Sequence, residues 1–266
     1  MPDARADRDP SRGHRGAAAD GVHEDGARLD GARVHGAHED RGAAPAPAAS
    51  EDTVRAREAY GARAAEYTER FGGIEAAAAT DRRRVLEWAR AVHGPVLDVG
   101  CGPGQWTAFL AEHGVEAAGI DPTPEFVAAA RRLHPGMRYR LGHAESLAVA
   151  DGALGGVLAW YSLIHIRPER IDDVLREFAR ALRPGGGLAI GFVEAPVGAA
   201  IDHAVTTAYA WPVPELSARV ERAGFTVVST ERRTDPGARP HGSLTAMRGD
   251  RGDRGGRGGR GDRGQR

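Results

Sequence analysis

The chain is 266 residues long and carries 36 cationic residues against 37 acidic ones, a formal net charge of -1. This balance excludes a strongly basic nucleic-acid-binding protein and a strongly acidic protein. Every cation is an arginine, because the sequence contains no lysine, and glycine reaches 37 residues. The bias is typical of GC-rich coding sequence, so an arginine cluster or a glycine run is not by itself a sign of function.

The single cysteine, Cys101, excludes an internal disulfide and a four-thiolate zinc site. Residues 1–20 contain no apolar run long enough for a signal peptide, and no stretch of about 18 consecutive apolar residues occurs. We therefore expect a cytoplasmic protein with no membrane span.

Composition divides the chain into three parts. Residues 1–50 contain no aromatic residue and end on the linker-like AAPAPAAS. Their apolar side chains are nearly all Ala, too few to offset an ordering cost of about 1 to 2 kcal/mol per residue. We predict a disordered extension at 1–50, a folded domain at 51–247 and a disordered tail at 248–266.

The tail reads RGDRGDRGGRGGRGDRGQR, with an arginine at every third position. Such Arg-Gly tails can bind RNA through phosphate contacts and stacking. Here Asp residues dilute the charge and no aromatic residue is present for base stacking, so we favour a repeat without a dedicated ligand. An RNA-directed role assisted by this tail is the alternative interpretation.

The folded part begins with two helices and then alternates strands and helices. Helices are expected at 52–70, 74–92, 104–114, 122–136, 168–182 and 214–223. Strands are expected at 95–100, 115–121, 137–141, 156–161, 188–193, 225–231 and 244–248. Continuous apolar runs indicate strands buried on both faces, which predicts an α/β fold with a doubly wound, largely parallel sheet.

The most informative motif is VLDVGCGPGQWT, at residues 96–107. It places Gly100, Gly102 and Gly104 on the turn between a strand and a helix. Glycines there allow positive backbone φ angles and let a ligand approach the main chain. The spacing is G-x-G-x-G, whereas nicotinamide-binding loops usually read G-x-G-x-x-G. A nicotinamide-dependent oxidoreductase is therefore disfavoured, although it stays an alternative.

Two carboxylates accompany this turn. Asp98 lies two positions before the first glycine, where it can accept hydrogen bonds near a cationic ligand but would be poorly placed beside a pyrophosphate. Asp121 ends the next strand and can accept hydrogen bonds from both hydroxyls of a ribose. The pair predicts a site for a nucleoside without phosphates.

Over residues 60–248 or so, the chain resembles the class I S-adenosylmethionine-dependent methyltransferases of the small-molecule type. Besides the glycine turn, AYGARAAEYTERFG is similar to the family's Tyr-containing helix over the cofactor, and LGHAESLAVADGALGGVLAWYSLIHI to its adenine loop and fourth strand. LREFARALRPGGGLAIGF is similar to its next helix, Pro-Gly turn and fifth strand. The resemblance implies a Rossmann-like, seven-stranded sheet in the order 3-2-1-4-5-7-6, with strand 7 antiparallel and N-terminal lid helices. It also implies S-adenosyl-L-methionine as cofactor and a small-molecule methyl acceptor.

The resemblance also implies roles for individual residues. Asp98 and the backbone of Gly100–Gly104 would face the methionine part of the cofactor. Asp121 would hold the ribose, and the loop His143–Glu145 the adenine. The residues expected to bind the cofactor are Tyr60, Tyr67, Asp98, Gly100, Cys101, Gly102, Gly104, Trp106, Thr107, Asp121, Pro122, His143, Ala144, Glu145 and Trp160.

The adenine loop departs from the family pattern. Many relatives have Asp before the Ala of this loop, whereas this chain has His143, which lacks a carboxylate for the exocyclic amine. The backbone at Ala144 can still contact the base. Leu147-Ala148 also replaces the usual Leu-Pro, and Leu154-Gly155 the usual Phe-Asp.

Methyl transfer needs few catalytic residues, because the sulfonium already activates the methyl group and orientation supplies up to about 7 to 11 kcal/mol. His165 follows the fourth strand, where open α/β sheets bind ligands, and is a candidate catalytic residue or a structural histidine. His203 lies after the fifth strand, a usual substrate wall in this family, and is a second candidate. Four aromatic residues either line the substrate site or fill the core: Trp160, Tyr161, Tyr209 and Trp211.

The domain shows no close set of metal ligands such as H-x-x-x-H, and no N-P-P-Y motif follows the fourth strand. We therefore expect a methyltransferase that acts on a small molecule without a metal, rather than on DNA adenine or protein glutamine. The alternatives are the same fold with other chemistry and the RNA-directed role.

Overall fold

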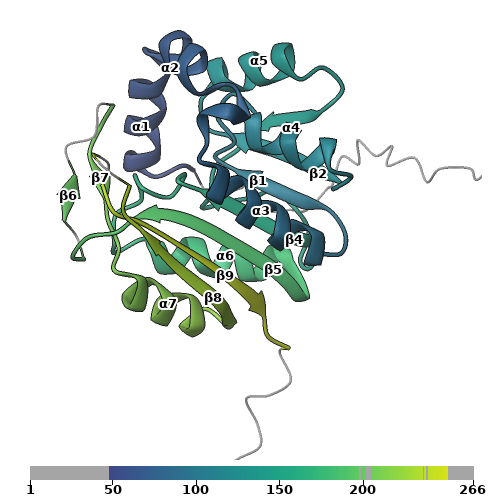
Figure 1. Ribbon diagram of the computed structural model, residues 1–266, viewed down its shortest axis with the longest axis vertical. Coiled ribbons are helices and arrows are strands. Elements are labelled where there is room, and N and C mark those ends of the chain that lie inside the picture. Colours follow the sequence, from purple (N-terminus) through teal and green to yellow (C-terminus); the bar gives the residue numbers. More distant parts are fainter. Residues whose placement is uncertain (1–47, 198, 202–204, 236, 238, 251–266) are drawn as a thin grey trace, which may run out of the picture. The chain divides into compact units, whose positions relative to one another are not determined.

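The structure is a computed structural model that describes residues 48–197, 199–201, 205–235, 237 and 239–250. Its centre is a seven-stranded sheet in the order β3-β2-β1-β4-β5-β9-β8 (Figure 1). The strands are β1 (Val96–Val99), β2 (Ala117–Asp121), β3 (Arg138–Leu141), β4 (Leu154–Trp160), β5 (Leu182–Val193), β8 (Phe225–Arg233) and β9 (His241–Arg248). β1 to β5 pair in parallel, whereas β9 runs antiparallel to both β5 and β8. With β9 as strand 7, the predicted order 3-2-1-4-5-7-6 is confirmed.

Helices cover both faces of this sheet. On one face lie α3 (Ala79–Ala91), α4 (Gln105–Glu112) and α5 (Pro124–Leu133). On the other face lie α6 (Ile171–Ala181) and α7 (Val213–Arg222). Successive strand residues point to opposite faces, so Leu97 and Val157 contact the second layer while Val96 and Leu158 contact the first. No helix within the described ranges is long and apolar enough to cross a membrane.

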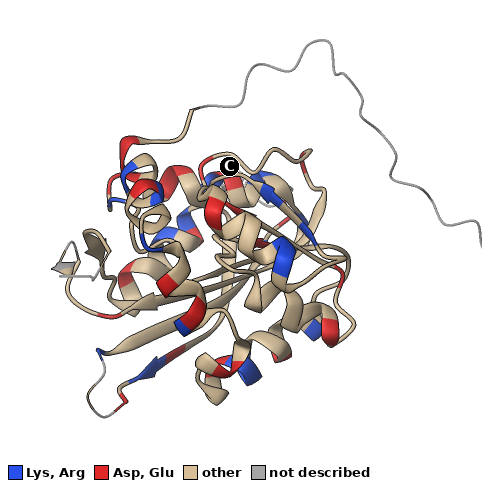
Figure 2. Ribbon diagram, turned by 90° about the horizontal axis from the view of Figure 1, so that it is seen from above, with Lys and Arg blue, Asp and Glu red and all other residues tan. Residues whose placement is uncertain are grey.

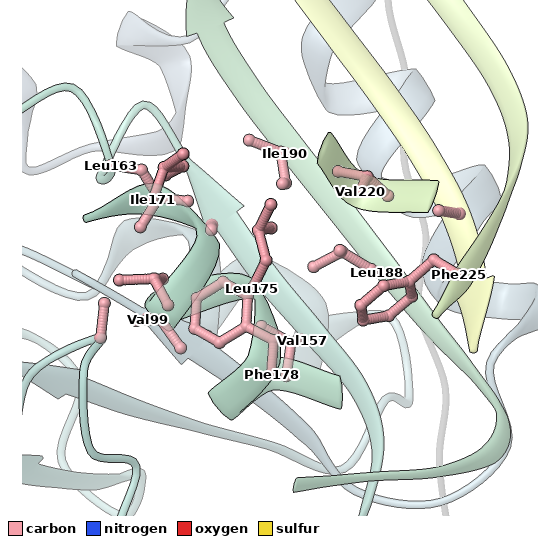
Figure 3. Packing of buried hydrophobic residues seen from close by; sticks show 14 of the residues in the cluster. Val99, Val157, Leu163, Ile171, Leu175, Phe178, Leu188, Ile190, Val220 and Phe225 are labelled. Carbon is pink, nitrogen blue, oxygen red and sulfur yellow. The ribbon is translucent and has the colours of Figure 1, made fainter. Parts of the chain in front are cut away.

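The larger core cluster lies between the sheet and the second helix layer (Figure 3). Leu175 and Phe178 of α6 are fully buried and project toward Val157 and Leu188 of the central strands. Burial of side chains of this size stabilises the fold by about 1.5 to 3 kcal/mol each. This packing fixes the central strands, and with them the loops at the strand ends.

Two expectations about the N-terminal helices were wrong in detail. The helix expected at 52–70 is divided into α1 (Glu51–Gly61) and α2 (Ala64–Phe71), because Arg63 leaves the helical backbone, with φ -121° and ψ 14°. The break follows a glycine, a weak helix former. The helix expected at 74–92 is a short 3-10 turn (Ile74–Ala76) followed by α3.

The segment between β5 and α7 contains two short strands that the sequence does not predict. β6 (Ala200–Ile201) pairs antiparallel with β7 (Ala208–Tyr209). Two-residue strands are too short for a period-2 pattern to be recognised. His203 lies outside the described residues, as does most of the predicted extension and tail.

Charged residues of both signs are interspersed over the helices and the outer strands (Figure 2). β4, at the centre of the sheet, carries none. Ion pairs between such exposed charged side chains contribute little to stability. The informative charged groups are therefore the few buried ones, above all Asp98 and Asp121, which are 1% and 5% exposed.

Candidate functional site

A cavity lies at the carboxyl ends of the parallel strands. Its walls are the loops that follow β1 to β4, together with α1 and α5, which is where open α/β sheets bind ligands. Twelve of the fifteen residues expected to bind the cofactor line it: Tyr60, Tyr67, Gly100, Cys101, Gly102, Trp106, Asp121, Pro122, His143, Ala144, Glu145 and Trp160. His165 lines it as well. The structure thus brings together residues more than 100 positions apart in the sequence.

The glycine turn after β1 forms one side of the cavity. Gly100 has φ 73° and Gly102 φ 53°, in the left-handed region that favours glycine. A Cβ on Gly100 would lie 2.4 Å from the Cβ of Ser162, whereas a Cβ on Gly102 would have no atom within 4 Å. Gly100 is therefore required for packing, and Gly102 leaves open space beside the main chain.

This contrast predicts different consequences for two alanine substitutions. Gly100→Ala should destabilise the fold by more than the about 1 to 2 kcal/mol of left-handed strain, because the new methyl overlaps Ser162. Gly102→Ala bears only that strain, so its main effect should be weaker cofactor binding. Thermal unfolding and calorimetric titration separate the two effects; equal losses of melting temperature would contradict the assignment.

Asp121 organises the turn from the end of β2. Its Oδ2 accepts a hydrogen bond from the Gly102 amide at 2.9 Å, and its Oδ1 from the Thr123 amide at 2.8 Å. Burial raises the pKa of Asp121 to about 6, although these amides favour the ionised form. A carboxylate has about four lone-pair sites, so it can still accept from a ligand in the cavity.

Asp98, Gly104 and Thr107 were expected at the cofactor but do not line the cavity. The hydroxyl of Thr107 donates to Asp98 Oδ2 at 2.7 Å, and both residues are buried. The carbonyl of Gly104 accepts a hydrogen bond from the hydroxyl of Tyr139 at 3.1 Å. Burial and the charge of Asp121 raise the pKa of Asp98 to about 7, despite the hydrogen bond from Thr107. The three residues hold the wall of the cavity from behind.

Three buried polar atoms of the cavity wall have no hydrogen-bond partner among the described residues. They are Oε1 of Gln105, Nε1 of Trp160 and Oγ of Ser162. An unpaired buried polar group costs about 1 to 3 kcal/mol, so such groups call for a ligand or water. One acceptor and two donors match the ammonium and carboxylate of an amino acid. Gln105 and Ser162 were not predicted, although each is next to a residue singled out in the sequence.

α1 covers the cavity from the N-terminal side. Thr53, Ala56 and Arg57 line it together with Tyr60, at spacings of three, four and seven residues, which is one helical face. Only Tyr60 of this face was predicted from the sequence, although the spacing of the other three residues is visible there. Tyr60 and Tyr67 lie on different helices, yet their rings meet edge to face at 5.5 Å.

The start of α1 is attached to the loop after β3. Ser50 is the N-cap, and its Oγ donates to Glu145 Oε1 at 2.6 Å, as does the hydroxyl of Thr53 at 2.8 Å. A second connection joins Arg167 Nε to Asp52 Oδ2 at 2.6 Å. These contacts hold the lid helix in place over the cavity.

The hydrogen bonds of His165 define its tautomer. Nδ1 lies 2.7 Å from the carbonyl of Thr207, which can only accept, so Nδ1 carries a proton. Nε2 lies 3.0 Å from the hydroxyl of Tyr60. Burial raises the pKa of Tyr60, so this phenol is a neutral donor and Nε2 is the acceptor. Nε2 is therefore unprotonated and accepts from the Tyr60 hydroxyl, so a substrate group would have to displace this phenol for Nε2 to act as a general base.

The other candidate residues divide between the cavity wall and the core. Cys101 is a free, buried cysteine, and burial raises the pKa of its thiol, which keeps it unreactive. Trp211 is 2% exposed in the core, whereas Tyr161 lines the cavity beside Trp160. No group of three His, Cys, Asp or Glu side chains in the described part of the chain is arranged to hold a metal ion.

Residues 96–186 match a family model described as a methyltransferase domain. The chain is 30% identical over 142 residues to an uncharacterized methyltransferase of Synechocystis sp. strain PCC 6803, covering 50% of this chain and 67% of that protein. The chain thus belongs to the class I S-adenosylmethionine-dependent methyltransferases. It spans only 36% to 48% of the length of other curated relatives.

Two solved structures share the fold. One is the 1,6-didemethyltoxoflavin N1-methyltransferase of Burkholderia thailandensis, with a TM-score of 0.59 and 22% identity over 78% of this chain and 94% of that chain. The other is the [4+2]-cyclase SpnF, with a TM-score of 0.63 and 20% identity over 77% of this chain and 98% of that chain. At these identities the likeness concerns the fold alone.

Proposed function

We propose that this protein transfers the methyl group of S-adenosylmethionine to a small-molecule acceptor by in-line displacement. The observation that carries the proposal is the cavity itself, which combines a glycine turn, a buried carboxylate and three unpartnered polar atoms at the strand ends. The S–CH3 bond breaks as the bond from the acceptor to the methyl forms, and the electron pair stays on sulfur. The family membership of the chain supports the cofactor, and the B. thailandensis neighbour is named for a small-molecule acceptor.

The residues of the cavity suit the three parts of this cofactor. Asp121 accepts from the ribose hydroxyls. Gln105 Oε1 accepts from the ammonium group of the methionyl part, and Trp160 Nε1 and Ser162 Oγ donate to its carboxylate. The buried charges of Asp98 and Asp121 favour a cation in the cavity. Each assignment satisfies a group that the protein alone leaves with unused hydrogen-bonding capacity.

The remaining walls align the acceptor and exclude water. The rings of Tyr60 and Tyr67 both pack against the ring of Phe126, with centroid distances of 5.7 and 5.1 Å. Together they form an aromatic layer over the cavity. His165 takes the proton of an acceptor hydroxyl or ammonium at Nε2 when that group replaces the Tyr60 hydroxyl as the partner of Nε2. His203, in the segment between the fifth strand and the next helix, is a second candidate for substrate contact. A cytoplasmic location is part of this proposal.

The direct test incubates the full chain with cofactor labelled in the methyl group and a panel of small metabolites. Transfer of label to a metabolite and formation of S-adenosylhomocysteine are expected. Calorimetry with S-adenosylmethionine and with NADH tests the cofactor independently, and tight binding of NADH alone would contradict the proposal. Deleting residues 251–266, which leaves β9 intact, should leave metabolite methylation unchanged; loss of activity together with RNA affinity would favour the RNA-directed alternative.

A second candidate is the same cofactor site used without methyl transfer. It is favoured by one observation, that SpnF shares the fold and is named a cyclase. Cofactor binding with turnover of a substrate but no transfer of label would support it.

The assignment of His165 predicts a specific kinetic result. His165→Ala should lower kcat by about 10²-fold or more if it removes a general base, while the Kd of the cofactor changes little. Tyr60→Phe is the matched control, because it removes the hydrogen bond to Nε2 but keeps the base. Equal losses of turnover and cofactor affinity in His165→Ala would assign His165 a structural role. His203→Ala can be judged by the same comparison.

A further inference from the structure

A groove separate from the candidate site lies between α3 and the C-terminal strands of the sheet. Leu244 and Ala246 of β9 belong to the core on the side of α6 and α7, so Thr245 and Met247 of the same strand face the side of α3. α3 packs on β5, and the sheet continues beyond it with β9 and β8. The groove lies along this step and shares no lining residue with the cavity at the strand ends.

The walls of the groove are apolar and partly open to solvent. Ala91 and Val92 of α3 line one side, and Val228 of β8 and Met247 of β9 line the other. Val228 is 61% exposed and Met247 is 50% exposed. Gly187 of β5 keeps the floor close to α3, because a Cβ there would lie 2.7 Å from Cγ2 of Val92. A ligand in the groove would remove this apolar surface from water, which favours binding.

Trp88 directs an unused hydrogen-bond donor toward the groove. The residue is 8% exposed, and its Nε1 has no hydrogen-bond partner among the described residues. The indole spans two strands: Cη2 lies 3.3 Å from the place of a Cβ on Gly156 of β4, and Nε1 lies 2.9 Å from that of a Cβ on Gly187 of β5. The nitrogen edge therefore points away from β4, toward β5 and β9, which line the groove. A buried donor without an acceptor calls for a ligand or water.

Arg84, one helical turn before Trp88, supplies a second unused donor. Its terminal nitrogens are engaged, Nη1 with Oε2 of Glu231 at 3.0 Å and Nη2 with Oγ of Ser229 at 3.1 Å. Its Nε is buried and has no partner within the described ranges. The hydroxyls of Ser229 and Thr245, which also line the groove, bond each other at 2.8 Å. Arg84 and Trp88 thus present two N–H donors to the groove.

The charges around the groove favour a neutral ligand over an anionic one. Arg84 is already paired with Glu231, and Glu87, an exposed residue, also lines the groove. A ligand carboxylate would compete with Glu231 for Arg84 and would be repelled by Glu87. A carbonyl oxygen accepts from N–H donors without carrying a charge.

We propose that this groove is a second binding site, for a small neutral molecule with an apolar body and a carbonyl oxygen that accepts from Nε1 of Trp88 and Nε of Arg84. The apolar body covers Val228 and Met247. The site does not depend on the proposed methyl transfer, because it shares no residue with the cavity, and its ligand and the cofactor bind at the same time.

The test titrates acetophenone, a neutral aryl ketone, into the full chain and follows the indole N–H resonances of the four tryptophans by ¹H–¹⁵N NMR. The resonance of Trp88, identified by its loss in Trp88→Phe, should move downfield and saturate with a Kd of about 1 mM, as expected for a ligand of this size. Trp88→Phe should weaken acetophenone about five- to tenfold, as expected for one hydrogen bond, with the backbone amides of Thr245 and Met247 as reporters. Fluorobenzene, whose fluorine is a poor acceptor, should bind this variant and the unmodified protein equally.

Trp211→Phe is the matched control, because Nε1 of Trp211 is also buried without a partner among the described residues but lies outside the groove and the cavity. It should keep the full affinity for acetophenone. Met247→Arg, at an exposed position, should fill the groove and weaken both probes, and it tests the site even if Trp88→Phe does not fold.

Four results would each overturn the inference: no saturable shift at Trp88, unchanged acetophenone affinity in Trp88→Phe, tighter binding of benzoate than of acetophenone, and displacement of acetophenone by S-adenosylhomocysteine. Simultaneous binding of acetophenone and S-adenosylhomocysteine is the expected result. If S-adenosylhomocysteine alone fails to bind, the proposed cofactor site fails and the groove does not.

Discussion

Replacing Asp121 by alanine is expected to weaken S-adenosylmethionine binding by about 1 to 3 kcal/mol, or roughly 5- to 150-fold in Kd. Two losses combine in this variant. The ribose hydroxyls lose their acceptor, and the buried amides of Gly102 and Thr123 lose theirs. The glycine turn therefore loses its support from β2 as well as its contact with the ligand. Calorimetric titration of the purified variant measures the effect.

The matched control for Asp121→Ala is Glu112→Ala, which removes an exposed carboxylate at the end of α4, outside the cavity. It changes the net charge by the same amount, so it separates a local effect from a general one. Its Kd should equal that of the unmodified protein. Equal affinity of Asp121→Ala and the control would remove Asp121 from the cofactor site.

The second large effect is a dependence of stability on pH in the absence of cofactor. Burial raises the pKa of Asp98 from 3.8 to about 7 and that of Asp121 from 3.8 to about 6. Between about pH 4 and these values the folded state binds more protons than the unfolded state, so stability falls as the pH rises. Each carboxyl contributes up to about 1.4 kcal/mol per pH unit within its window. Urea unfolding at a series of pH values should show this decline up to about pH 7.

Glu145 acts in the opposite direction at lower pH. The pKa of Glu145 is lowered to about 2 from 4.5, so its contribution is complete above about pH 4.5 and is lost as the pH falls toward 2. Maximal stability of the free protein is therefore expected near pH 4 to 5. Asp98→Asn keeps an acceptor for Thr107 and should flatten the decline above pH 5. A decline that persists unchanged in this variant would contradict the assignment to Asp98.

Cofactor affinity should follow the reverse trend. A cationic ligand favours the ionised carboxylates, so binding should strengthen by up to about tenfold per pH unit as the pH rises toward 6 and level off above about 7. Titrations in buffers of different ionisation enthalpy should detect proton release on binding. An affinity independent of pH from 5 to 8 would mean that neither carboxylate is ionised by the ligand.

The sequence was sufficient for the architecture because its strands are short apolar runs between glycines and its helices are strongly amphipathic. The order of the sheet came from the resemblance and not from periodicity, since pairing between distant strands leaves no local pattern. The break after Gly61 was missed because Ala, Arg and Glu continue across it and favour helix. Helix propensity cannot locate an end that packing decides.

The candidate site was predictable where a residue type is required by the backbone, as at Gly100, and less so where burial decides the role. Asp98 was expected beside the ligand, yet Thr107 satisfies it behind the cavity wall. The unpartnered oxygen of Gln105 has no signature in the sequence, because only the folded arrangement shows which polar atoms lack partners. The link between Glu145 and Ser50 joins residues 95 positions apart.

The link between Glu145 and Ser50 couples the ordering of α1 energetically to the binding of a nucleoside in the cavity. Because Glu145 bonds Ser50 and Thr53 through one oxygen and His143 through the other, ordering either side of the carboxylate favours ordering the other. Reciprocity then requires that an occupied cavity protect α1 from proteases, and that detaching α1 weaken the affinity for the spent nucleoside.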